Sequence, residues 1–142
     1  MKKLLILLML IPMPLYAVTV TATSTTSTST SDILGDINIY RAKYNLTPLE
    51  VNEDLCTLAK ARTEQIKTDW SHGGFQDEVD KLPNMGGVFY ENLARNYETE
   101  DVVWAWSMSQ FGHREAMLVS EMKYGCVIES DKHFAFEGYI PK

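Results

Sequence analysis

The sequence predicts a mixed α+β domain in which helices cover a small sheet. From residue 33 onward, apolar residues recur at helical spacing through the first part of the chain. Two β-rich runs at residues 124–129 and 134–140 come last, with only a short polar turn between them, so we expect an antiparallel hairpin. Helices followed by a hairpin are typical of a domain whose helices pack on one sheet.

Length and composition fit one globular domain. The chain has 142 residues, of which 45% are hydrophobic and 23% are charged, a balance unlike that of disordered or collagen-like chains. Its 13 Lys and Arg against 19 Asp and Glu give a formal charge of −6. Because no basic excess is present to neutralise phosphates, nucleic acid is not expected as a partner.

The first 17 residues predict a secretory signal peptide. A positive start at residues 1–3 precedes an apolar run at residues 4–11, and Ala17 is a small residue suited to cleavage. The apolar run is much shorter than the roughly 20 residues that span a bilayer. We therefore favour cleavage over a retained anchor, and expect a secreted protein, extracellular or periplasmic, with no membrane span after cleavage.

Residues 18–31 are rich in Ser and Thr and are interpreted as a linker. Such a composition buries too little apolar surface to offset the entropy of ordering the chain. An edge strand is the alternative, because Thr suits strands. The folded domain is then residues 32–142.

The chain contains two cysteines, Cys56 and Cys126. In an oxidising compartment we expect a disulfide between them. Two buried free thiols are the alternative, and a metal site is disfavoured because neither cysteine has a Cys or His at ligand spacing.

Capping residues and helical periodicity define the elements before the hairpin. The first helix is expected to end near Asn45 and to be followed by a turn at residues 46–49. Asn52 is placed to cap a second helix whose apolar face continues to Trp70.

Shorter elements are expected between the second helix and the hairpin. A polar loop holds one short helix near residues 77–81, and residues 88–94 form an apolar segment interrupted by one acid. Thr99 can cap a third helix running to Phe111, followed by a short helix at residues 113–119.

Two of the three histidines are candidate cleft residues. His72 lies in a Gly-flanked loop after the second helix, and His113 starts a helix, positions where a neutral imidazole can bind a cation. The alternative is that both are hydrogen-bonded loop fillers. His133 lies beside the hairpin turn and is expected to be exposed.

Glu91 is the candidate acid, because it interrupts an apolar segment. If it faces inward, it must find a partner or shift its pKa; alternation along a strand could instead turn it to solvent. Glu115 resembles a solvated surface acid. Ser109 precedes His113 by four residues, but no nucleophile-elbow pattern supports a serine hydrolase.

The order of these motifs identifies a family resemblance. His72 follows a Leu/Ala-rich helix, and ENLA at residues 91–94, Trp106 and GHREAML at residues 112–118 come after it. This set resembles the cysteine-rich secretory protein, antigen 5 and pathogenesis-related superfamily (the CAP or SCP-like domain), most closely its short bacterial branch. The resemblance implies a three-layer α-β-α sandwich with a small central antiparallel sheet.

The resemblance also implies a cleft with two histidines and acidic residues, which in several relatives binds a divalent cation such as zinc. By motif, the binding cleft would contain His72, Glu91 and His113, with the two histidines as metal ligands. Two imidazoles and one carboxylate could hold Zn²⁺ with water in an open position.

One acid of the larger eukaryotic members is not matched. It is expected a few residues after Trp106, where residues 107–109 are Ser, Met and Ser. Glu115 does not stand at the matching position.

The cleft residues are compatible with two functions and with a purely structural role. The first is a secreted, non-catalytic binding module for a lipid, an envelope component or a protein partner, and the unmatched acid favours it. The second is a metal-dependent or His-assisted hydrolase or protease. A third reading treats the cleft residues as a packing network.

Overall fold

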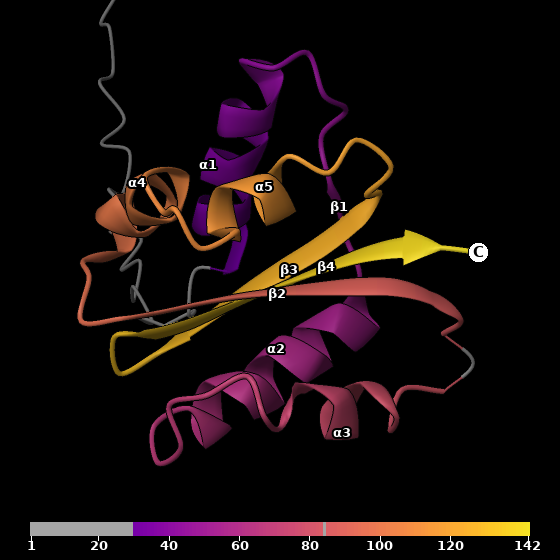
Figure 1. Cartoon of the computed structure of the whole chain (residues 1–142), viewed down its shortest axis with the longest axis vertical. Coiled ribbons are helices and arrows are strands. Elements are labelled where there is room, and N and C mark those ends of the chain that lie inside the picture. Colours follow the sequence, from indigo (N-terminus) through magenta and orange to yellow (C-terminus); the bar gives the residue numbers. More distant parts are fainter. Residues whose placement is uncertain (1–29, 84) are drawn as a thin grey trace, which may run out of the picture.

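A four-stranded sheet separates two layers of helices (Figure 1). The computed structural model describes residues 30–83 and 85–142. The predicted signal peptide and all but the last two residues of the predicted linker lie outside these residues. The predicted three-layer α+β sandwich is confirmed.

The sheet is built around the predicted hairpin. Its strands are β1 (Glu50–Val51), β2 (Gly87–Arg95), β3 (Tyr124–Ser130) and β4 (His133–Pro141), in the spatial order β1-β3-β4-β2. Both β2 and β3 pair with β4 in antiparallel register. The two-residue strand β1 was not predicted, and it pairs with β3 in parallel, so the sheet is antiparallel except at this edge.

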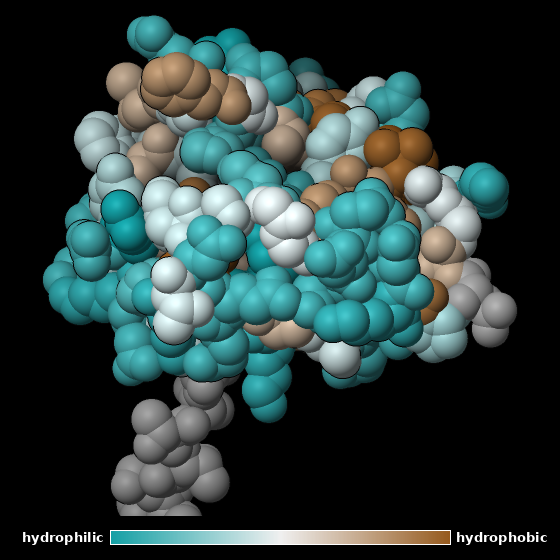
Figure 2. All heavy atoms as spheres, turned by 60° about the horizontal axis from the view of Figure 1, so that its bottom comes forward, coloured by the Kyte–Doolittle hydropathy of each residue, from teal (hydrophilic) through white to brown (hydrophobic). Residues whose placement is uncertain are grey.

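Each face of the sheet is covered by helices. One layer contains α1 (Thr30–Ala42), α4 (Val102–Ser107) and α5 (His113–Met117), and the other contains α2 (Glu53–Gln65) and α3 (Phe75–Val79) (Figure 1). The outer surface of the α2–α3 layer is mostly hydrophilic (Figure 2). Within residues 30–83 and 85–142, no helix combines the length and apolar character needed to cross a membrane.

Strand β4 is buried on both faces, which explains its apolar sequence. Phe134 and Phe136 belong to the core beneath α1, α4 and α5, whereas Ala135 and Tyr139 belong to the cores beneath α2 and α3. A strand covered on both sides needs apolar residues at successive positions rather than alternate ones.

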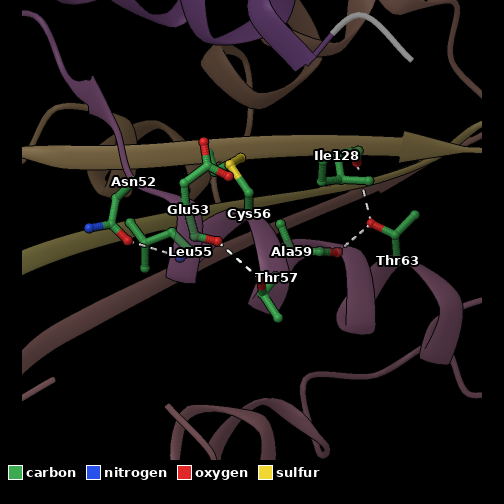
Figure 3. Close-up of a disulfide and its surroundings, with 9 residues drawn as sticks. Asn52, Glu53, Leu55, Cys56, Thr57, Ala59, Thr63 and Ile128 are labelled. Atoms are coloured by element: carbon green, nitrogen blue, oxygen red, sulfur yellow. Dashed lines mark hydrogen bonds between the residues drawn. A yellow bond between two sulfur atoms is a disulfide. The ribbon is translucent and has the colours of Figure 1, made fainter. Parts of the chain in front are cut away.

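Helix α2 begins as predicted but ends earlier. The Asn52 side chain accepts a hydrogen bond from the Leu55 backbone N–H (3.1 Å), the predicted N-cap (Figure 3). The helix ends at Gln65 with Ile66 as its C-cap, and the chain then tightens into a turn in which the Lys67 and Thr68 N–H groups bond three residues back, to Glu64 (3.4 Å) and Gln65 (3.1 Å). Trp70 therefore lies in the following loop, 40% exposed, and not on the helix face.

The predicted third helix is also shorter. Thr99 opens a 3₁₀ turn, η1 (Thr99–Asp101), whose N-cap is Glu98. The Thr99 hydroxyl donates to Glu129 (2.7 Å) instead of capping a helix. Helix α4 then ends at Ser107, so Phe111 lies in a loop and is 92% exposed.

One buried arginine fastens α1 to the loops before β3. Arg41 is fully buried and donates to the carbonyls of Thr47 (3.0 Å), Met117 (2.7 Å) and Val119 (2.9 Å). Burial lowers the pKa of this guanidinium. These hydrogen bonds replace the ones that the Arg41 guanidinium would make to water. They also give partners to backbone carbonyls of α5 and of the adjoining loops.

The predicted disulfide joins the α2 layer to the sheet. Cys56, in the first turns of α2, is bonded to Cys126 on β3, and the two lie 70 positions apart (Figure 3). Cys126 is completely buried, in a core that contains Leu55 and Leu58. This confirms the disulfide over the alternative of two free thiols.

Removing the disulfide should strongly destabilise the domain. For a closed loop of this length, the loss of loop entropy from the unfolded chain contributes about 4 kcal/mol. We expect the Cys56→Ala/Cys126→Ala double variant to lose a comparable free energy of unfolding in urea. Reduced wild-type protein is the matched control and should unfold at the same urea concentration as the double variant. Equal stability of oxidised and reduced wild-type protein would contradict the prediction.

Candidate functional site

The site is organised by β2, an edge strand whose successive residues point to opposite faces of the sheet. Glu91 points toward α2, where it contacts Arg62. Asn92 points to the other layer, where its amide donates to the backbone carbonyl of His113 (2.8 Å). The ENLA segment thus fixes groups from both helical layers at the same edge.

Glu91 faces inward and forms a buried ion pair. Its side chain is 2% exposed and that of Arg62 is 1% exposed. Arg62 Nε donates to Glu91 Oε2 (2.6 Å), and Arg62 Nη2 donates to Oε1 (3.2 Å). This fork-to-fork geometry is the strong form of an arginine–carboxylate contact, and it excludes the solvent-facing alternative for Glu91.

Arg62 also fixes the loop that carries His72. Its Nη2 donates to the Ser71 carbonyl (2.7 Å) and its Nη1 to Gln65 Oε1 (2.5 Å). A Cβ on Gly74 would lie 2.7 Å from Arg62 Nη1, so the glycine leaves room for the guanidinium. The loop after α2 is therefore built around this one cation.

His72 is held by Glu91 and reaches solvent. Its Nδ1 lies 2.7 Å from Glu91 Oε1, while 59% of the side chain is exposed. With an ionised Glu91, Nδ1 carries the proton and Nε2 is left as the free ring nitrogen. The carboxylate thus orients the ring and sets its tautomer.

His113 starts α5 after Gly112, whose φ of 91° is in the left-handed region that favours glycine. Burial, and secondly the neighbouring His72, lower the pKa of His113. A neutral imidazole is therefore the dominant form at neutral pH.

Both histidines line one cavity of about 400 Å³, together with Trp70, Leu93 and Phe111. A second cavity of about 490 Å³ shares Trp70, Leu93 and His113 with the first. We call the two cavities together the aromatic groove. The second cavity is also lined by Trp104 and Trp106, so all three tryptophans of the chain border the groove.

Large exposed apolar side chains surround the aromatic groove. They are Trp70, Tyr97, Trp104, Met108 and Phe111, each at least 40% exposed. The Arg95 guanidinium lies 4.5 Å from the centre of the Trp70 ring and is, among the residues that the structure describes, the only Lys or Arg lining either cavity. A larger hollow of about 680 Å³ lies between α3 and the start of β2, but no histidine lines it.

Two further candidates lie outside this arrangement. Glu115 is 63% exposed, pairs loosely with Arg114 (3.5 Å), and does not line the groove, so it does not supply the unmatched acid. Ser109 Oγ accepts from the Phe111 N–H (3.1 Å), and no hydrogen bond joins Ser109 to His113 within the described residues. No nucleophile–base pair is present there.

The donor set does not fit a metal centre with three protein ligands. Within the described ranges, no three His, Cys, Asp or Glu side chains are placed to hold one ion. Both oxygens of Glu91 accept hydrogen bonds from Arg62 and His72 in a buried position, and Glu91 does not line the aromatic groove, so this carboxylate orients His72 instead of facing an ion there. His72 and His113 alone remain, and no chemical step is assigned to a metal.

Sequence reasoning missed two residues of the site. Neither Arg62 nor Glu137 is singled out by the sequence patterns described above. Glu137 is a completely buried acid on β4, opposite Glu91 in the β2–β4 register. The argument that selected Glu91, an acid inside an apolar run, applies equally to Glu137.

A family model described as "Cysteine-rich secretory protein family", or CAP, matches residues 34–139. The chain belongs to this family. A comparison with curated proteins found no match to this CAP domain.

Solved structures of bacterial proteins share the CAP fold. A cysteine-rich secretory protein from Staphylococcus aureus has a TM-score of 0.68 at 16% identity over 75% of this chain, and an extracellular protein containing an SCP domain from Bacillus anthracis has 0.71 at 23% over 80%. This chain covers only 36% and 40% of those two chains. An outer surface protein of Borrelia burgdorferi has a TM-score of 0.67 at 24% identity over 78% of this chain and 90% of its own.

Glu91→Gln should be far more destabilising than His72→Ala. Loss of the carboxylate leaves Arg62 as a buried cation without its counter-ion, and we expect a loss of about 3 kcal/mol in the free energy of unfolding. His72 is largely exposed, so its removal should cost less than about 1 kcal/mol. Urea denaturation of both variants measures the contrast; a large loss for His72→Ala would instead support a packing role for that ring.

His72→Ala should raise the pKa of His113. Burial lowers this pKa and the electrostatic effect of the neighbouring His72 lowers it further, so removal of His72 should recover part of the shift and leave the part due to burial. Titration followed by NMR of the imidazole C–H protons measures the change. His133→Ala is the matched control, because His133 lies at the hairpin turn; an unchanged His113 midpoint in His72→Ala would show that the two rings do not interact.

Proposed function

We propose that this CAP domain is an exported, non-catalytic binding module whose ligand occupies the aromatic groove. The observation that carries the proposal is the grouping of both imidazoles and all three tryptophans around adjoining cavities with an exposed apolar rim. Exposed apolar clusters of this kind mark binding surfaces, and concave sites with few polar groups are typical of ligand pockets.

The polar groups of the aromatic groove suit an uncharged or weakly anionic ligand. His113 is neutral near pH 7, and His72 presents a free ring nitrogen, so both rings can accept hydrogen bonds from hydroxyl or amide groups. Arg95 adds one positive charge in an otherwise acidic protein. A lipid, an envelope component or a protein partner can combine these features with an apolar part for the aromatic rim.

Binding is favoured over hydrolysis by the state of Glu91. A general base must reach its substrate's proton, whereas both oxygens of Glu91 are engaged by Arg62 and His72 in a buried position. The alternative is a metal-dependent or His-assisted hydrolase. It would require His72 and His113 alone to bind a metal ion, or to activate a nucleophile that comes with the ligand or the solvent.

Three observations support export. The N-terminal pattern is that of a signal peptide, a disulfide joins Cys56 to Cys126, and proteins of similar fold are described as secretory, extracellular or outer surface proteins. We propose that the domain acts outside the cytoplasm.

Intrinsic tryptophan fluorescence provides the test, because all three tryptophans border the aromatic groove. The mature protein is titrated separately with phosphatidylglycerol vesicles and with soluble peptidoglycan fragments. We expect a saturable change with one probe, weakened at least about tenfold in Phe111→Ala, since a few aromatic side chains carry most of the binding energy of an interface. Ile39→Ala, which removes an exposed apolar residue outside the groove, should bind like wild type.

Other outcomes separate the alternatives. Equal weakening by Ile39→Ala and Phe111→Ala, or no saturable change with either probe, would count against the groove as a binding site for these ligands. Calorimetric titration with zinc chloride is the parallel measurement. Saturable zinc binding that is lost in both His72→Ala and His113→Ala would favour the metal-dependent alternative.

A further inference from the structure

Glu137 is a buried acid with no hydrogen-bond partner as an anion. It lies on β4 opposite Glu91 on β2 and Cys126 on β3, on the face covered by α2. The residue is completely inaccessible to solvent, and neither carboxylate oxygen has a partner within the described residues. An ionised carboxylate in this position would lack both water and donors, which is among the most costly arrangements in a protein interior.

The surrounding charges do not compensate for an anion. Glu91 faces Glu137 from β2 and Arg62 faces it from α2, while the β3 neighbour Cys126 is in a disulfide and does not titrate. One buried cation therefore stands beside two acids, and its strongest contacts go to Glu91. Burial first, and then the charge on Glu91, raise the pKa of Glu137 well above its ordinary value.

Glu91 has one acceptor position left for its neighbour. An ionised carboxylate offers about four lone-pair sites. Arg62 fills two of them and His72 fills a third. Glu137 is the register partner of Glu91 on β4, so the two side chains lie side by side on the same face of the sheet. A protonated Glu137 can therefore donate to the position that Glu91 has left.

We propose that Glu137 is a neutral carboxylic acid in the folded domain and donates a hydrogen bond to Glu91, which makes it a positioning residue for the Glu91–His72 pair. The site then has a second acid, supplied by β4 rather than by the segment after Trp106. This inference goes beyond ligand binding and does not depend on which ligand the groove accepts.

The proposal has a defined pH signature. Below the ordinary carboxyl pKa of 4.5, both folded and unfolded chains hold the proton, and the full stability is present. As the pH rises, the unfolded chain releases the proton first, so stability falls until the folded acid also ionises. Over that window, the unfolding constant should rise about tenfold per pH unit from this group alone.

Glu137→Gln isolates this signature, because an amide is a neutral near-isostere that can still donate to Glu91. We expect the ratio of wild-type to variant unfolding constants to rise about tenfold per pH unit above about pH 5. Glu115→Gln, at an exposed acid, is the matched control and should give a flat ratio. A flat ratio for Glu137→Gln would overturn the proposal.

The protonation state of Glu137 can also be measured directly in the wild-type protein. With ¹³C-labelled wild-type protein, the Glu137 side-chain carboxyl should keep the chemical shift of a protonated acid at pH 6, whereas the shift of an ionised carboxylate would overturn the proposal. Positioning is tested by the ring ¹⁵N shifts of His72. These His72 shifts should be retained in Glu137→Gln, whose amide can still donate to Glu91, and altered in Glu137→Leu, which has no donor. Identical His72 shifts in the two variants would reduce Glu137 to a packing role.

Discussion

The buried ion pair of Arg62 and Glu91 is the interaction on which the rest of the site depends. A guanidinium and a carboxylate that are both almost inaccessible to solvent are stable only if each finds further partners. Arg62 finds them in Ser71 and Gln65, and Glu91 finds one in His72. Because these partners belong to α2, to the loop after it and to β2, satisfying one pair of charges also fixes the loop that carries His72 beside the aromatic groove.

The second constraint is the two-residue period of β2. Glu91 and Asn92 are neighbours in sequence but lie on opposite faces of the sheet, where they hold His72 and the backbone of His113. A strand at the edge of the sheet is the only place where groups from both helical layers can approach each other without a strand between them. A one-residue shift of the β2–β4 register would exchange the two faces and separate the histidines.

Local patterns in the sequence predicted most of the elements and singled out His72, Glu91 and His113 as candidates, and they failed where long-range contacts decide. The Asn52 cap, the hairpin and the Cys56–Cys126 disulfide were predicted correctly, because each has a local or chemical signature. Strand β1 is only two residues long and exists through its pairing with β3. Arg62 was missed because a helical arginine acquires its role only from distant partners, here Glu91 on β2 and the Ser71 carbonyl. Glu137 was missed although it has the same local signature as Glu91, an acid inside an apolar strand.

The two helical layers are attached to the core by different chemistry. The α2 layer has a covalent bond through Cys56 and Cys126, whereas α1 is fastened through hydrogen bonds of Arg41 to backbone carbonyls. A thiol reductant therefore acts on one layer only. In reducing surroundings, amide hydrogen exchange should accelerate first along α2, and Arg62 would leave its place together with that helix. The layer that contains Arg62 is thus the one whose attachment depends on an intact disulfide, although neither cysteine lines the groove.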